Sequence, residues 1–154
     1  MSFDLPPAAA QQFQLGLQQF NQGEYYACHD TMEDLWMEAE FAEKPFFQGI
    51  LQFSVALYHL GNHNWQGTAI LLGEGIGRLE PFEPIYHGID VSHLLDCASD
   101  WLALVQQLGP QQVVLLATAL IQIQQGQPGP GATATLPQWQ IKLRDAASST
   151  DGLP

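Results

Sequence analysis

The residues most able to do chemistry begin with His29, Glu33 and Trp36, which follow one another at intervals of four and three positions. At that spacing the side chains of a helix lie on one face and can touch. His29 and Glu33 fall on the shoulder of an apolar stripe, in line with Trp36. An imidazole and a carboxylate at the edge of a core need polar partners, because burying an unpaired charge is costly. We therefore expect polar groups of a neighbouring helix to face them.

The next predicted helix, residues 45–63, carries few polar residues, and those few align. Gln48, Gln52, His59 and His63 fall within about 60° of one another on a helical wheel, while nearly all other residues of the segment are apolar. Two helices thus each gather their atypical polar side chains on one face. This pattern predicts that the two faces meet.

An antiparallel hairpin of residues 24–39 and 45–63, turning near Ala42, sets the register of these faces. Residues equally far from the turn then face each other, which places Glu33 level with Gln52. The predicted binding residues are His29, Glu33, Trp36, Gln48, Gln52 and His59, with His63 outside the site.

Three interpretations of the cluster of His29, Glu33, Gln52 and His59 stay open. The first is a buried hydrogen-bonded network that fixes helix register. The second is a divalent metal ion on His29, Glu33 and His59 with metal-assisted hydrolysis as its chemistry, although glutamine is a poor zinc ligand. The third is a pocket for a small molecule. We favour a ligand-binding helical domain, and whether it is an enzyme stays open.

The elements that position these residues are all predicted to be helices. Apolar residues recur at helical spacing in every segment except residues 113–123. That segment is apolar on all sides and rich in β-branched residues, so a strand stays open there, and we favour a buried helix because its surroundings are helical. Asn64 and Asp90 suit the capping of the helices that follow them. Pro81 and Pro84 indicate an irregular loop. Because the connections are short, we predict an all-α, antiparallel multi-helix bundle of about five to six helices with an irregular C-terminal arm. The predicted helices span residues 8–20, 24–39, 45–63, 65–79, 91–108 and 113–123.

Four glycines interrupt the helix predicted for residues 65–79. Each weakens the helix by about 1 kcal/mol relative to alanine. Close approach to a neighbouring helix is the reason we expect for them. They are Gly67, Gly73, Gly75 and Gly77.

Two parts are expected along the chain: a helical bundle domain in residues 1–125, and a Pro/Gly-rich arm with a short docking segment in residues 126–154. Residues 127–137 have the composition of a linker. Trp139 follows, and a large aromatic residue on an otherwise flexible tail usually anchors something. We predict that Trp139 is buried, either against its own bundle or in a homo-oligomer formed through the arm.

Residues 28–36 read C-H-D-T-M-E-D-L-W, and this segment resembles the H-x-x-x-E-x-x-W signature of a small helical family of unknown function, DUF309. Further motifs of that family occur in order: F-N-Q-G-E-Y, F-x-Q-G-x-x-Q, N-x-x-G and G-I-D. The resemblance covers roughly residues 13–108. It implies an all-α bundle and no established activity.

The charge of the chain limits its partners. The net charge is −12, and only four of the 154 residues are Lys or Arg. Four scattered cations cannot neutralise a run of phosphates, so we expect neither nucleic acid nor a membrane as a partner. The negative field favours cations or basic proteins, which makes an acidic protein-interaction module a further alternative.

The remaining polar residues are assigned to ordinary roles. The acids of residues 30–43 are predicted to form a solvated face, and His87 and His93 to be isolated surface histidines. Cys28 and Cys97 lack the spacing of a redox or zinc motif, so we expect two small buried side chains. No apolar stretch is long enough to span a bilayer and no signal peptide is visible, so the cytoplasm is the expected location.

Overall fold

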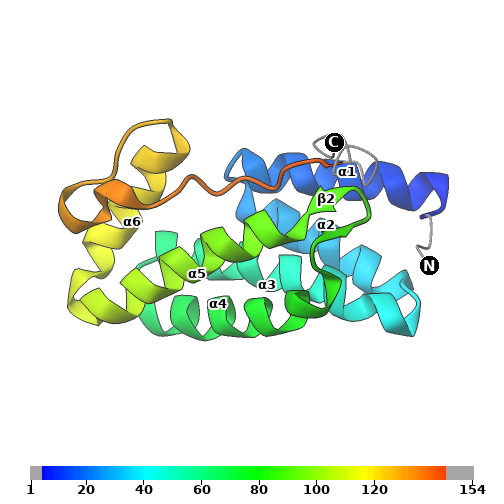
Figure 1. Cartoon of the computed structure of the whole chain (residues 1–154), viewed down its shortest axis with the longest axis horizontal. Helices are drawn as coiled ribbons and strands as arrows, with labels where there is room; N and C mark the ends of the chain where they lie inside the picture. Colours follow the sequence, from blue (N-terminus) through cyan, green and yellow to red (C-terminus); the bar gives the residue numbers. More distant parts are fainter. Residues whose placement is uncertain (1–4, 145–154) are drawn as a thin grey trace, which may run out of the picture.

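Six α-helices make up most of residues 5–144, the part of the chain that the computed structural model describes (Figure 1). They are α1 (Pro7–Asn21), α2 (Tyr25–Glu38), α3 (Lys44–Gly61), α4 (Trp65–Leu79), α5 (Val91–Leu108) and α6 (Val113–Gln124). Short 3-10 segments accompany them: η1 (Phe41–Glu43), η2 (Glu80–Phe82), η3 (Pro110–Gln112) and η4 (Gly131–Thr135). The predicted all-α multi-helix bundle is confirmed.

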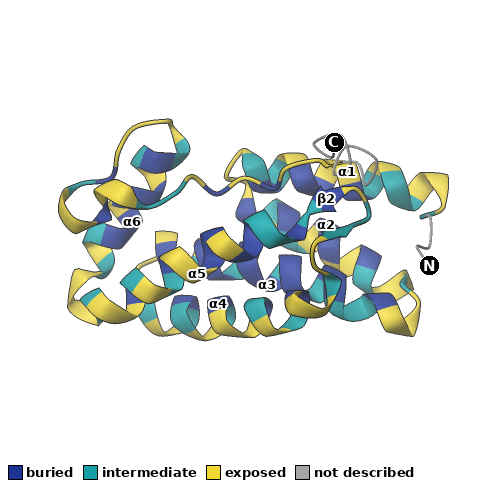
Figure 2. Cartoon of the chain, in the orientation of Figure 1, coloured by how far each residue is buried: buried dark blue, intermediate teal, exposed yellow. Residues whose placement is uncertain are grey.

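Consecutive helices from α1 to α5 run antiparallel, and α3 lies in the middle (Figure 1). It packs against α2 on one side and α4 on the other, while α1 covers α2 and α5 packs on α4. α3 is also a strongly apolar helix, and its burial contributes a large part of the hydrophobic stabilisation. Figure 2 shows the buried positions facing other helices and the exposed positions on the outer faces. α3 therefore fixes where the inner faces of α2 and α4 lie.

Two helix starts are capped as the sequence predicts. The side chain of Asn64 accepts a hydrogen bond from the backbone N–H of Gly67 at 2.9 Å. The side chain of Asp90 accepts one from the N–H of His93 at 2.9 Å. Each cap pairs a donor that the first helical turn leaves free, and so fixes where α4 and α5 begin.

The glycines of α4 divide into packed and open positions. A Cβ on Gly75 would lie 2.5 Å from Cε1 of Phe53 on α3, which is the predicted close approach. A Cβ on Gly73 or Gly77 would meet nothing within 4 Å, so the prediction is wrong for these two. Both are exposed, and nothing in the structure explains them.

Residues 81–90 are more regular than the predicted loop. After η2, the strands β1 (Ile85–Tyr86) and β2 (Ile89–Asp90) pair antiparallel. His87 and Gly88 form the tip with φ angles of 46° and 75°, the left-handed values that a two-residue hairpin turn requires. The sequence signal was weak because a histidine, and not a second glycine or an asparagine, occupies the first of these positions.

The arm folds back onto its own bundle. Trp139 is completely buried, and its ring packs against Phe20, Phe53 and Trp101 with centroids 6.0, 5.7 and 6.1 Å away. The side-chain amide of Gln124 donates to the carbonyl of Trp139 at 2.9 Å and accepts from its N–H at 2.7 Å, as a neighbouring strand would. The prediction that Trp139 is buried is confirmed.

Two smaller expectations concern membranes and disulfides. Within residues 5–144 no single helix is long and apolar enough to cross a membrane; Val91–Leu108 and Pro110–Gln124 meet the length and composition requirement only together, across a 107° bend. Cys28 and Cys97 are both free and buried. The two cysteines therefore occupy the apolar positions that the sequence predicts.

Candidate functional site

His29 lies on α2 between two carboxylates of its own helix. Its Nδ1 is 3.1 Å from Oδ1 of Asp30, and its Nε2 is 3.7 Å from Oε2 of Glu33. The side chain of His29 is 24% exposed, whereas that of Glu33 is 51% exposed. Glu33 is thus at the surface and not in a core. His29 is less exposed and lies between these carboxylates and a cavity that it lines.

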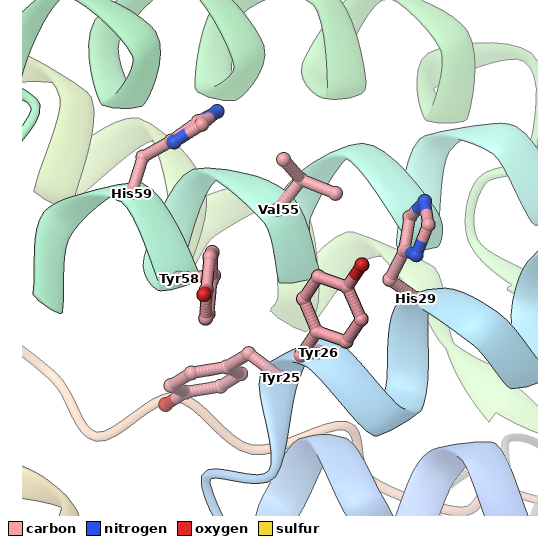
Figure 3. A pocket seen from close by; sticks show the side chains of 6 residues that line it. All are labelled: Tyr25, Tyr26, His29, Val55, Tyr58 and His59. Atoms are coloured by element: carbon pink, nitrogen blue, oxygen red, sulfur yellow. The ribbon is translucent and has the colours of Figure 1, made fainter. Parts of the chain in front are cut away.

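A cavity of about 140 Å³ opens between α2 and α3 beside His29. Its lining residues are Tyr25, Tyr26, His29, Val55, Tyr58 and His59. Figure 3 shows Tyr26 and Tyr58 between the two histidines, with Val55 on the α3 side. The ring centroids of Tyr26 and Tyr58 are 5.2 Å apart, and those of Tyr26 and His29 are 5.6 Å apart. Two of the predicted residues, His29 and His59, therefore line one cavity from two helices. We call it the α2–α3 cavity.

His59 is held from the α4 side. Its Nδ1 lies 3.4 Å from Nδ2 of Asn64, the residue that caps α4. A Cβ on Gly67 would lie 2.8 Å from Cδ2 of the His59 ring, so a glycine at this position leaves room for the imidazole. Asn64 and Gly67 are the two specified residues of the N-x-x-G motif. Asn64 contacts the His59 ring, and Gly67 leaves room for it.

Gln52 lies elsewhere, which corrects the predicted cluster. Its Nε2 donates to Oε1 of Glu74 at 3.0 Å, and its Oε1 accepts from Nε of Arg78 at 3.1 Å. Both partners are on α4, one turn apart. Because α4 offers a matched acceptor and donor, the buried amide is satisfied there and does not face Glu33 on α2.

Trp36 and Gln48 also lie outside the α2–α3 cavity. Nζ of Lys44 is 4.8 Å from the centroid of the Trp36 ring and donates to the Trp36 carbonyl at 2.6 Å. Lys44 is the first residue of α3, and its ammonium pairs with carbonyls that the last turn of α2 exposes. Gln48 is half-buried on α3. Trp36 therefore links α2 to the start of α3.

The histidines and acids do not gather into a metal-binding group. In the described part of the chain, no three His, Cys, Asp or Glu side chains are placed to hold one ion. His29 and Glu33 supply two of the three predicted ligands, and His59 contacts Asn64 instead. The arrangement offers imidazole and phenol rings around a small cavity.

A second polar cluster, absent from the sequence prediction, surrounds Glu43. Glu43 is buried, and its Oε1 accepts from the hydroxyl of Tyr86 at 3.0 Å and lies 2.5 Å from Nε2 of His87. Burial, reinforced by the Glu43 carboxylate, raises the pKa of Tyr86 to about 12, so that its hydroxyl stays a donor. The assignments of Glu43 to a solvated face and of His87 to an isolated surface position are both wrong.

Comparison with known proteins supports the resemblance found in the motifs. Residues 13–71 match the family model described as "Domain of unknown function (DUF309)", a range that includes every residue lining the α2–α3 cavity. The chain is 28% identical over 71 residues to the uncharacterized protein YpuF of Bacillus subtilis (strain 168), covering 46% of this chain and 41% of that protein. The chain thus matches less than half the length of this relative. No solved structure matches the chain.

Proposed function

We propose that this chain is a ligand-binding domain whose α2–α3 cavity receives one positively charged, ring-sized group. The observation that carries the proposal is the convergence of five ring side chains, three from α2 and two from α3, on one cavity. A cavity of about 150 Å³ in a protein accommodates benzene, so a volume of about 140 Å³ suits a single ring.

The surroundings of the α2–α3 cavity favour a cation. Tyr26 and Tyr58 are 57% and 41% exposed, so ring faces are open to a ligand, and such faces attract ammonium groups. The carboxylates of Asp30 and Glu33 lie against His29 at the edge of the cavity. With a net charge of −12, the chain also attracts cations at long range. An anionic ring would meet repulsion at the same place.

Three probes with the same ring and different charge test this function. Benzylamine, benzyl alcohol and benzoate are titrated into the full chain while amide and side-chain NMR shifts are followed. We expect saturable shifts in α2 and α3 with benzylamine, weaker binding of benzyl alcohol, and no binding of benzoate. Equal shifts with all three probes would contradict charge selection.

A double variant, Tyr26→Ala/Tyr58→Ala, locates the binding. Loss of two ring faces is expected to weaken benzylamine binding by roughly tenfold. Phe41→Ala is the matched control, because Phe41 is 88% exposed and does not line the α2–α3 cavity. Unchanged affinity in the double variant would place the binding elsewhere and refute the proposal.

Other expectations of the sequence stay predictions. Within residues 5–144, a divalent ion at His29 and Glu33 would have these two ligands and no third. An oligomer formed through the arm would have to use surface other than Trp139, which its own chain already buries. The cytoplasmic location and the exclusion of nucleic acid and membrane partners stay predictions from the sequence.

A further inference from the structure

A second cavity, larger than the α2–α3 cavity, lies between α1, α2 and η1. Its volume is about 370 Å³, which falls within the range of small-molecule sites. Leu35 and Phe47 line it together with apolar residues from the start of α1. Both are buried in the core, so the cavity offers an apolar wall to a ligand.

Four carboxylates line the same cavity: Asp34, Glu38, Glu40 and Glu43. Its described lining includes neither lysine nor arginine. Three of the four acids are exposed and belong to the rim, whereas Glu43 is buried. The four do not converge on one point, because no three of them are grouped closely enough for a metal ion. The spread of negative charge suits an elongated cation.

Glu43 is the buried acid of this cavity, and one of its two carboxylate oxygens accepts no hydrogen bond. Its side chain is 93% buried, being 7% exposed. The bonds from Tyr86 and His87 both end on Oε1. Among residues 5–144 no hydrogen bond ends on Oε2, and Glu43 lines the cavity. Oε2 is not itself enclosed by the described residues, so a donor that enters the cavity can reach it.

We infer that this cavity, which we name the acidic cleft, binds an alkylammonium ion. The ammonium group donates to Oε2 of Glu43, and the methylene stem lies along Leu35 and Phe47. A second ammonium on the same stem meets Asp34 and Glu38 at the rim. An ammonium has three donors and no acceptor, which matches a site whose charged groups are all acceptors. A free aliphatic diamine and the lysine side chain of a basic partner share this chemistry.

Calorimetric titration of the full chain with 1,5-diaminopentane tests the site. We expect saturable binding of the diamine and none of pentan-1-ol or glutarate, which have the same length and the wrong charge. N-acetyl-lysine methylamide separates the sources: binding of the diamine alone indicates a free diamine, and binding of both indicates that a lysine side chain also enters. Absence of binding for both amines overturns the inference.

Two sets of variants locate the binding in the acidic cleft. Glu43→Gln is expected to weaken diamine binding by roughly 10- to 100-fold, since it removes the buried charge that accepts the ammonium. Because Glu43 also supports the fold, the rim variant Asp34→Asn/Glu38→Gln provides a second measurement, with an expected loss of roughly threefold to tenfold. The matched control Asp96→Asn/Asp100→Asn removes the same charge from exposed positions on α5. An equal loss in this control would show diffuse attraction only and overturn the inference.

Discussion

Nε2 of His87 lies 2.5 Å from Oε1 of Glu43, although the two residues are 44 positions apart. Both side chains are only 7% exposed. Aromatic rings enclose the contact, since the His87 ring lies 5.6 Å from Phe46 and stacks on Phe47 at 6.1 Å. In such surroundings each partner depends on the other for its hydrogen bond.

Replacing Glu43 by alanine is therefore expected to destabilise the fold by about 2–4 kcal/mol, because it leaves the imidazole of His87 and the hydroxyl of Tyr86 without their acceptor. Urea denaturation followed by circular dichroism measures the loss. Glu40→Ala, an exposed acid three residues earlier, is the control and should change stability by less than about 0.5 kcal/mol. Similar losses in both variants would show that the buried contact does not stabilise the fold.

Replacing a glycine of α4 by alanine is expected to lower the stability of the fold at one position and to raise it at another. Gly75→Ala places a Cβ 2.5 Å from Phe53 and 3.2 Å from the carbonyl of Gly49, so we expect a loss of about 1–3 kcal/mol from overpacking. Gly73→Ala meets nothing within 4 Å and should gain up to about 1 kcal/mol from helix propensity. Thermal denaturation of the two variants measures both. A gain in Gly75→Ala would show that α3 and α4 are farther apart than described.

The Gly67→Ala variant is expected to weaken ligand binding without lowering the stability of the fold. Its Cβ would lie 2.8 Å from the ring of His59 and from Nδ2 of Asn64. Both are side chains that can turn aside, and loss of the Asn64 cap costs about 1 kcal/mol, which a gain in helix propensity of about 1 kcal/mol offsets. We expect a nearly unchanged melting temperature and a weaker affinity for benzylamine, because His59 leaves its position. Gly73→Ala, measured in the same titration, should bind as the unaltered chain does.

The parts of the fold that the sequence predicted are those set by local pattern. Helical periodicity located α1 to α5, whereas α6, apolar on all sides, was favoured as a helix only because its surroundings are helical. The cap residues Asn64 and Asp90 fell where expected, and the His29–Glu33 contact follows from spacing within one helix. Trp139 was predictable because few other environments suit a large ring on a polar tail. In each case the deciding interaction is close in sequence or depends on hydrophobicity alone.

Gln52 and His87 were placed incorrectly because their partners are distant. A helical wheel gives the face of Gln52 only approximately, and α3 has a helix on either side; the choice depends on Glu74 and Arg78. The direction of His87 depends on a left-handed turn and on packing against rings from α1 and α3. No short-range pattern encodes either arrangement.

The two buried cysteines are expected to make the free energy of unfolding depend on pH in the alkaline range. Burial raises the pKa of both Cys28 and Cys97 from 9.0 to about 12. The folded chain therefore holds both protons where the unfolded chain has released them. The stabilisation from this difference is complete below pH 9.0 and is lost as the pH rises from 9.0 towards 12.

Stability measured by urea denaturation on either side of pH 9.0 tests this linkage. Between one unit below and one unit above that value, the chain should lose roughly 2–3 kcal/mol more than a Cys28→Ala/Cys97→Ala variant, which has no thiol to ionise. At mildly alkaline pH a disulfide reagent such as Ellman's should react with neither thiol in the folded chain and with both in denaturant. Parallel pH profiles for the two proteins, together with rapid labelling of the folded chain, would show that these thiols reach solvent and titrate normally.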